Sequence, residues 1–114
     1  MKKEVVITGG LGFIGSAFAA YLDSMVKDHT IIILDKSKKN LSRINLKSKK
    51  NKIKIIIANT LQIESKLEKF KNITAVFHFG EFSRIVKSFK HYNECFVSNT
   101  LGTFKVLKFC KERN

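Results

Sequence analysis

Residues 5–15 read VVITGGLGFIG, an apolar run that leads directly into glycines at positions 9, 12 and 15. Such a run predicts a buried strand, and a second apolar run over residues 13–22 predicts a helix. The turn between them leaves backbone N–H groups free at the positive end of that helix, where a pyrophosphate group binds. We therefore interpret the stretch as a dinucleotide-binding turn, with a purely structural tight turn as the alternative.

Each glycine has its own expected role in this turn. Gly9 allows the chain to turn sharply out of the strand, and Gly12 lets a diphosphate approach the backbone. Gly15 lets the helix pack closely against the sheet, where a Cβ atom would push it away. The motif lies between a predicted strand and a predicted helix, which is the context that it requires.

The length and composition are those of one globular domain. The 114 residues are 44% hydrophobic, an ordinary fraction that argues against disorder. No apolar run approaches the roughly 18 residues of a membrane-spanning helix, and the TGG at 8–10 interrupts any signal-peptide core. We expect a single cytoplasmic domain over residues 1–114, with no membrane segment.

A formal net charge of +13 dominates the composition. Lysines carry most of it, with one cluster between positions 36 and 54, and arginine occurs only at positions 43, 84 and 113. Base readers and phosphate clamps favour arginine for its bidentate geometry. A solvated lysine-rich surface is our first interpretation, and a patch for a polyanion or an acidic protein is the alternative. We do not expect a nucleic-acid partner.

Predicted strands and helices alternate along the whole chain. The strand over 30–35 is almost wholly apolar, the pattern of a parallel strand that is covered on both faces. The other strands are expected over 4–8, 53–58 and 73–79, and the helices over 13–27, 61–70 and 93–111, with a short helix or mobile basic loop over 38–46. Right-handed crossovers then give a parallel sheet of order 3-2-1-4.

This order predicts an α/β, Rossmann-like, doubly wound sheet, incomplete at about four strands. Its ligand crevice is expected where the strand order reverses, at the carboxyl ends of the first and fourth strands. Asp35 ends the second strand there, and its carboxylate can accept hydrogen bonds from both hydroxyls of an adenosine ribose. This favours NAD, whereas Lys36, Lys38 and Lys39 leave NADP open because they could neutralise its extra phosphate.

The last predicted helix carries one apolar stripe at helical spacing. Its expected members are Phe96, Thr100, Thr103, Val106, Leu107 and Cys110. Phe104 and Phe109 fall off this stripe, so a second face is expected to be partly apolar. Cys95 and Cys110 would lie about 22 Å apart along the helix, far beyond disulfide reach, and we expect reduced core thiols and no metal site.

Four segments resemble the NAD-dependent epimerase/dehydratase family of extended short-chain dehydrogenases. They are TGGLGFIG at 8–15 for the cofactor fingerprint, ILD at 33–35 for the ribose-binding strand end, VFHFG at 76–80 for the strand-four signature, and NTLGT at 99–103 for a helix segment. They occur in the family's order and spacing, and the resemblance covers essentially the whole chain.

The resemblance implies roles for the residues that match the family's cofactor site. The pyrophosphate would be held by backbone N–H groups of Phe13 and Ile14 within the glycine turn. The residues implied for the adenosine ribose are Asp35, Lys36, Ser37, Lys38, Lys39 and Asn40. Those implied for the adenine are Asn59 and Thr60. Those implied for the nicotinamide side are Phe79, Gly80, Glu81, Ser83 and Asn99.

Three positions need comment against the family pattern. Asn59 stands where an aspartate is usual, and its amide still offers an acceptor to the adenine amino group in a weaker contact. Glu81 replaces a small residue and would bring an anion close to the centre of the cofactor. His78 matches a core strand position of the family, and we do not expect it to be catalytic.

The family's chemistry depends on a Tyr-x-x-x-Lys pair, in which the tyrosine acts as an acid or base and the lysine lowers its pKa. At that spacing Tyr21 is followed by Met25 and Tyr92 by Phe96, so neither tyrosine supplies the pair. The chain resembles the first third of such an enzyme and stops about where a fifth strand would begin, before the catalytic region and the sugar-nucleotide domain.

Three functions follow as hypotheses. The first is the NAD(P)-binding portion of a sugar-nucleotide epimerase or dehydratase, in which NAD takes a hydride from a sugar carbon and returns it. The second is a non-catalytic nucleotide-binding or interaction module, and the third a basic nucleic-acid binder. Since an open edge on the fourth strand and the apolar helix 93–111 invite pairing, we also expect a homo-oligomer or a complementary chain.

Overall fold

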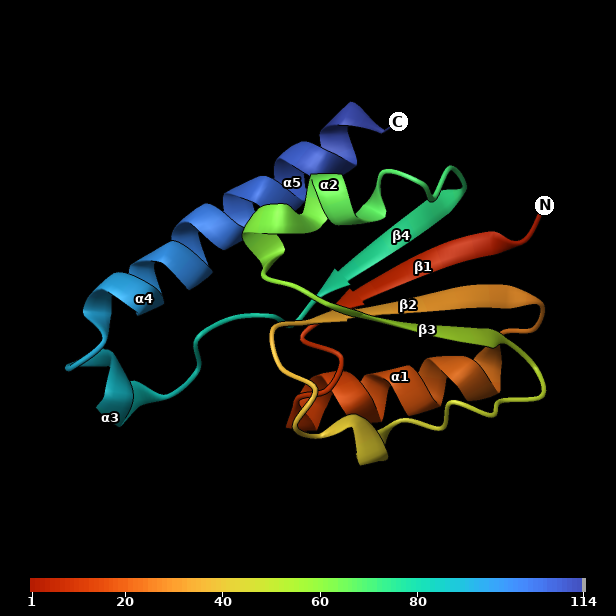
Figure 1. Cartoon of the computed structure of the whole chain (residues 1–114), viewed down its shortest axis with the longest axis horizontal. Coiled ribbons are helices and arrows are strands. Elements are labelled where there is room, and N and C mark those ends of the chain that lie inside the picture. Colours follow the sequence, from red (N-terminus) through yellow and green to blue (C-terminus); the bar gives the residue numbers. More distant parts are fainter. Residues whose placement is uncertain (114) are drawn as a thin grey trace.

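The computed structural model describes residues 1–113 and shows a parallel sheet between two helical layers (Figure 1). The strands are β1 (Lys3–Thr8), β2 (His29–Asp35), β3 (Lys52–Ile57) and β4 (Ile73–His78). They lie in the order β3-β2-β1-β4, and every neighbouring pair is parallel. The predicted Rossmann-like order 3-2-1-4 is thereby confirmed, with each strand within one or two residues of its expected bounds.

One face of the sheet is covered by α1 (Phe13–Met25), and the other by α2 (Ile63–Leu67) and α5 (Thr103–Glu112) (Figure 1). The predicted helix over 61–70 is shorter than expected, since a 3₁₀ turn at Thr60–Gln62 precedes α2. The basic stretch 38–46 contains only the 3₁₀ turn Leu41–Arg43. No helix among the described residues is both long and apolar enough to cross a membrane.

The central strand β2 contributes to two separate cores, one on each face of the sheet. Ile32 and Leu34 pack toward α2 and α5, where Phe109 completes the core. Ile31 and Ile33 point to the opposite face and pack under α1. All four isoleucine and leucine side chains are fully buried, which explains why this strand reads as an uninterrupted apolar run.

A nearly continuous helical segment runs from α4 (Tyr92–Phe96) through a π-helical turn (Val97–Gly102) into α5. The predicted stripe on this segment was wrong on both sides of the π turn, since Phe96, Thr100, Leu107 and Cys110 are exposed and Val106 is the stripe member that is buried. Phe109 is 2% exposed and belongs to the core, whereas Leu107 is 64% exposed. A π turn holds more residues than an α turn, so it rotates the residues after it relative to an unbroken helical pattern.

The cysteines also lie differently from our expectation. Cys110 follows the buried Phe109 and is exposed, and Cys95 is only half-buried. Both are free thiols, but the prediction that they lie in the core was wrong. A short helix that we did not predict, α3 (Ile85–Ser88), lies between β4 and α4.

Candidate functional site

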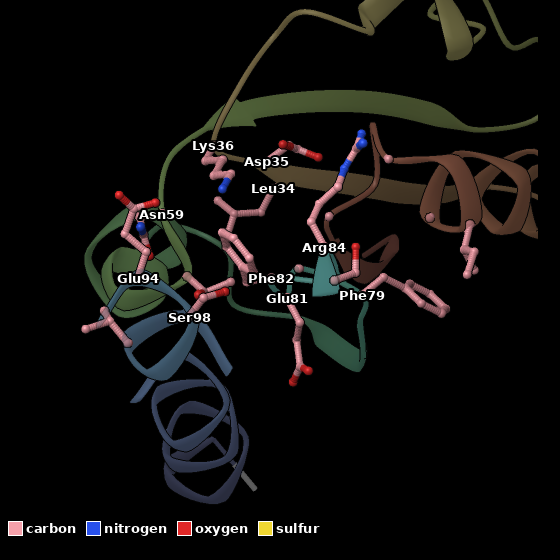
Figure 2. A pocket seen from close by; sticks show the side chains of 18 of the residues that line it. Leu34, Asp35, Lys36, Asn59, Phe79, Glu81, Phe82, Arg84, Glu94 and Ser98 are labelled. Carbon is pink, nitrogen blue, oxygen red and sulfur yellow. The ribbon is translucent and has the colours of Figure 1, made fainter. Parts of the chain in front are cut away.

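A crevice of about 1160 Å³ opens at the carboxyl edge of the sheet, beyond the paired ends of β1 and β4 (Figure 2). Its position agrees with the one expected from the reversal of strand order. The lining includes many of the residues that the sequence singled out: Gly9, Gly12, Phe13, Ile14, Gly15, Asp35, Lys36, Asn59, Thr60, Phe79, Gly80, Glu81 and Ser83.

The glycine turn is packed tightly between the end of β4 and the start of α1. Gly9 has a φ of +65°, and a Cβ there would lie 2.6 Å from the carbonyl carbon of Phe79. A Cβ on Gly15 would overlap the carbonyl oxygen of Gly9. Only glycine therefore fits at these two positions, and the turn brings the start of α1 to the mouth of the crevice.

The N-terminus of α1 offers free hydrogen-bond donors to the crevice. The first helical bond runs from Ser16 N to Gly12 O, so the N–H groups before it have no partner within the helix. No side chain among the described residues caps this end, and its first turn holds no acidic residue. The side chains of Phe13 and Ile14 are exposed beside these donors. The arrangement suits an anionic group.

The carboxylate of Asp35 is held firmly at the end of β2. Its Oδ2 accepts a hydrogen bond from Leu11 N at 3.0 Å, and its Oδ1 accepts one from Ser37 N at 3.2 Å. Arg43 Nη1 in turn donates to Leu11 O at 3.2 Å and anchors the glycine turn from its outer side. A carboxylate has about four acceptor sites, so Asp35 retains acceptors for a ligand's hydroxyl groups.

The buried side chain of Thr8 connects β1 to the chain that follows β4. Its Oγ1 accepts hydrogen bonds from Phe79 N and Gly80 N, both at 3.1 Å. Because the hydroxyl oxygen already accepts these two hydrogen bonds, the hydroxyl donates its hydrogen to Nδ1 of His78, with an O···N distance of 2.6 Å. The ring hydrogen of His78 is thereby assigned to Nε2. His78 thus takes part in the hydrogen bonding that organises this edge of the sheet.

The hydrogen-bond chain continues from His78 to Glu81. His78 Nε2 lies 3.1 Å from Thr103 Oγ1 and 3.3 Å from Glu81 Oε1, and Thr103 Oγ1 donates to Glu81 Oε1 at 2.6 Å. The Glu81 carboxylate therefore turns toward α5, and Figure 2 shows it pointing away from Asp35 and Lys36. This separates the glutamate's charge from the ribose end of the crevice.

Some of the expected site residues lie outside the lining. Ser37, Lys38, Lys39 and Asn40 follow β2 on its loop and do not border the crevice. Asn99 does not border it either: its Oδ1 accepts from Phe82 N at 2.6 Å, and its Nδ2 donates to Phe82 O at 2.9 Å. Asn99 therefore holds the backbone of a lining residue in place.

Asn59 borders the crevice but also has a structural role. Its Oδ1 accepts a hydrogen bond from Leu61 N at 3.0 Å, and its N–H donates to Gln62 Oε1 at 3.1 Å. These two bonds form a capping box at the start of the 3₁₀ turn that precedes α2. The Asn59 side chain is therefore fixed at the end of the crevice near β3.

Sequence reasoning missed a second wall of the crevice. It is formed by residues of α3, α4 and the segments beside them: Phe82, Arg84, Lys87, His91, Asn93, Glu94, Val97 and Ser98. The separation of Arg84 and Lys87 by three residues was the available signal, since it places both on one side of a helical turn. Within residues 1–113, no group of three His, Cys, Asp or Glu side chains could hold a metal ion.

A family model described as the NAD dependent epimerase/dehydratase family matches residues 5–114. The chain belongs to this family. Over 114 residues it is 35% identical to a dTDP-D-glucose 4,6-dehydratase of Dictyostelium discoideum, and the match covers 96% of this chain and 26% of that protein. It is 33% identical to an ADP-L-glycero-D-manno-heptose-6-epimerase of Fusobacterium nucleatum, covering 96% of this chain and 32% of that one.

Solved structures of epimerases have the same fold as this family member. An epimerase of Methanothermobacter thermautotrophicus matches with a TM-score of 0.82 and 25% identity, over 99% of this chain and 33% of that one. A UDP-N-acetylglucosamine 4-epimerase of Methanobrevibacter ruminantium, solved with UDP-N-acetylmuramic acid, matches with a TM-score of 0.79 and 29% identity, over 100% and 36% of the two chains. This chain thus spans about a third or less of the relatives it matches.

Proposed function

We propose that residues 1–114 form the NAD-binding, Rossmann-like portion of a sugar-nucleotide epimerase or dehydratase. The observation that supports this most directly is the joint placement of the glycine turn, the free N-terminus of α1 and the anchored Asp35 carboxylate around one crevice. The sugar-nucleotide enzymes among the relatives supply the reaction class, which concerns the whole protein of which such a portion is part.

In this proposal the crevice residues divide the cofactor between them. The N–H groups at Phe13 and Ile14 bind the pyrophosphate, and Asp35 accepts hydrogen bonds from the adenosine ribose hydroxyls. A carboxylate repels a 2′-phosphate, which favours NAD. Lys36 borders the crevice next to Asp35 and keeps NADP as the second candidate.

When bound, NAD supplies a hydride acceptor for a sugar carbon. The residues of this chain hold and orient the cofactor, and the Thr8–His78–Glu81 hydrogen bonds fix the backbone at the nicotinamide side. None of the 114 residues forms a Tyr-x-x-x-Lys pair. In this proposal the acid–base step falls to residues other than these 114, and a non-catalytic nucleotide-binding module is the second candidate function.

Substituting Asp35 with alanine is expected to weaken NAD binding at least about tenfold, because hydrogen bonds to a charged group contribute roughly 1.5–3 kcal/mol. Calorimetric titration of the 114-residue chain with NAD and NADP checks this. Glu68→Ala, which removes an exposed carboxylate that follows α2 and does not border the crevice, is the matched control and should bind NAD like the unmodified chain. Equal NAD affinity in the Asp35→Ala and Glu68→Ala variants would contradict the assignment of Asp35.

We also propose that the chain associates with a second copy or a complementary polypeptide through β4 and the helical segment 92–112. β4 lies at an edge of the sheet, and the outer face of the helical segment exposes Phe96, Phe104 and Leu107. Exposed strand edges and contiguous apolar surface favour association with another chain.

Light scattering coupled to size-exclusion chromatography at micromolar concentration is expected to give a mass above the 13.0 kDa of one chain. The double substitution Phe104→Ser and Leu107→Ser should shift the distribution toward one chain, because it removes apolar area from the contact. Met25→Ser changes an exposed apolar residue on the opposite helical layer and should leave the mass unchanged. A monodisperse species of one chain would rule out self-association.

A further inference from the structure

The segment 84–89, which contains α3, exposes its apolar side chains to solvent and places its cationic side chains along the crevice. Its apolar residues are outward, with Ile85 77%, Val86 82% and Phe89 80% exposed. The cationic side chains of the same segment, Arg84 and Lys87, border the crevice instead. A helix on a protein normally turns its apolar residues inward and its charges to solvent. The arrangement brings two positive charges from one segment to a site whose lining also includes Lys36 and three carboxylates.

The acidic residues that border the crevice already have partners. Asp35 accepts two backbone hydrogen bonds, and Glu81 is bound to Thr103 and His78. Glu94 lies 3.5 Å from Nδ1 of His91, which occupies the same wall. Among residues 1–113, none of these carboxylates forms an ion pair with Arg84 or Lys87.

The cationic side chains that border the crevice, by contrast, have no carboxylate partner among residues 1–113. Across residues 1–113 there is no ion pair or side-chain hydrogen bond for Lys36, Arg84 or Lys87. Figure 2 shows Arg84 extending from its loop toward the side where Asp35 and Lys36 lie. Three cationic side chains without an ion pair therefore border the crevice from two walls, alongside the carboxylates of Asp35, Glu81 and Glu94 and the N–H groups of α1.

We propose that Arg84 and Lys87, together with Lys36, bind a diphosphate group of a ligand in this crevice. An arginine can hold two phosphate oxygens at once with its planar fork, and a lysine adds a mobile point charge. The proposal rests on the proposed function insofar as both concern the same crevice, but it assigns the charged second wall rather than the glycine turn. Side chains of the α3 segment carry it, not the terminus of that short helix.

The diphosphate could belong to the dinucleotide or to a nucleoside diphosphate that occupies the crevice beside it. Pockets for one small ligand have volumes of roughly 300–1,000 Å³. The crevice has about 1160 Å³, a volume just above the upper end of that range. Both sources share the chemistry that the cations would recognise, and separate titrations distinguish them.

The test is calorimetric titration of the 114-residue chain with NAD and, separately, with UDP. The variant combines Arg84→Ala and Lys87→Ala, and the control combines Lys90→Ala and Lys105→Ala, which removes the same net charge from exposed positions outside the crevice. Equal thermal unfolding midpoints for the two double variants verify that the fold is retained. We expect the Arg84/Lys87 variant to lose at least about tenfold in affinity relative to the Lys90/Lys105 variant for one of the two ligands.

Each outcome decides between the proposals. A selective loss for NAD assigns the cations to the cofactor's diphosphate, and a selective loss for UDP assigns them to a second nucleotide. Suppose that the unmodified chain binds NAD and that the two double variants have equal affinities for both ligands. The proposal that Arg84 and Lys87 bind a diphosphate is then overturned, and the proposed function stands. If the Arg84/Lys87 variant loses affinity for UDP and NAD does not bind to the unmodified chain, the proposed diphosphate site is supported and the proposed function fails. Binding of neither ligand at millimolar concentration overturns both.

Discussion

Replacing Gly15 with alanine is expected to lower the free energy of unfolding by about 3 kcal/mol, the upper end for adding one methyl group to a packed site. The new Cβ would overlap the carbonyl oxygen of Gly9 and lie 2.8 Å from its carbonyl carbon. Both atoms are backbone, so no side chain can rotate away to make room. Either α1 moves off the sheet or the glycine turn distorts, and NAD binding should be lost in both cases. Urea denaturation followed by circular dichroism measures the first effect.

Gly12→Ala is the matched control because it separates folding from binding. Gly12 has a φ of −71°, which alanine adopts freely, and its Cβ would meet only Gly9 O, at 3.2 Å. We expect a loss of stability below about 1 kcal/mol, together with weaker NAD binding, since the methyl group would enter the space of the diphosphate. A Gly15→Ala variant as stable as the Gly12→Ala variant would contradict the tight packing of α1 on the turn.

Replacing Thr8 with valine should cost about 2–3 kcal/mol of unfolding free energy, although the two side chains have nearly the same shape. The hydroxyl is buried, accepts from Phe79 N and Gly80 N, and donates to His78 Nδ1. Phe79 N retains a second acceptor in Thr8 O at 3.0 Å, but Gly80 N loses its acceptor and His78 Nδ1 loses its donor. Chemical denaturation gives the energy, and nitrogen NMR of the imidazole reports the changed hydrogen bonding at Nδ1.

Thr74→Val makes the same chemical change on β4 at an exposed site. Thr74 Oγ1 donates one hydrogen bond of 3.3 Å to Glu4 O, and water can replace that bond. We expect its effect to stay within about 0.5 kcal/mol, as for other surface substitutions. If Thr8→Val and Thr74→Val destabilise the protein equally, the hydroxyl of Thr8 does not organise the end of β4.

The sheet could be predicted from the sequence because its signals are local and strong. The buried run of β2 has a single physical explanation, namely coverage on both faces, and the glycine turn specifies which strand precedes which helix. The strand order follows from these assignments and the handedness of the crossovers. The end of the crevice formed by Gly9 and Asp35 was therefore within reach of sequence reasoning.

The second wall of the crevice could not be predicted from the sequence, because it depends on contacts between residues that are far apart in the chain. Asn99 was assigned to the cofactor, yet its amide binds the backbone of Phe82, seventeen positions earlier in the chain. Arg84 and Lys87 resemble ordinary surface charges until α3 is placed beside the crevice. The apolar stripe of the last helix failed because apolar residues lie on more than one of its faces, and periodicity alone did not show that Phe109 rather than Leu107 meets the core.

The π turn between α4 and α5 lets one continuous helical segment meet two unrelated demands. After the turn, Val106 and Phe109 complete the core that supports the sheet. Within it, Val97 and Ser98 face the crevice and Asn99 holds Phe82. Because the wide turn separates the angular phase of these two groups, residues that shape the ligand site can diverge while the core contacts are inherited unchanged. Substitutions at the crevice end of this helical segment therefore need not disturb the core contacts that its other end makes.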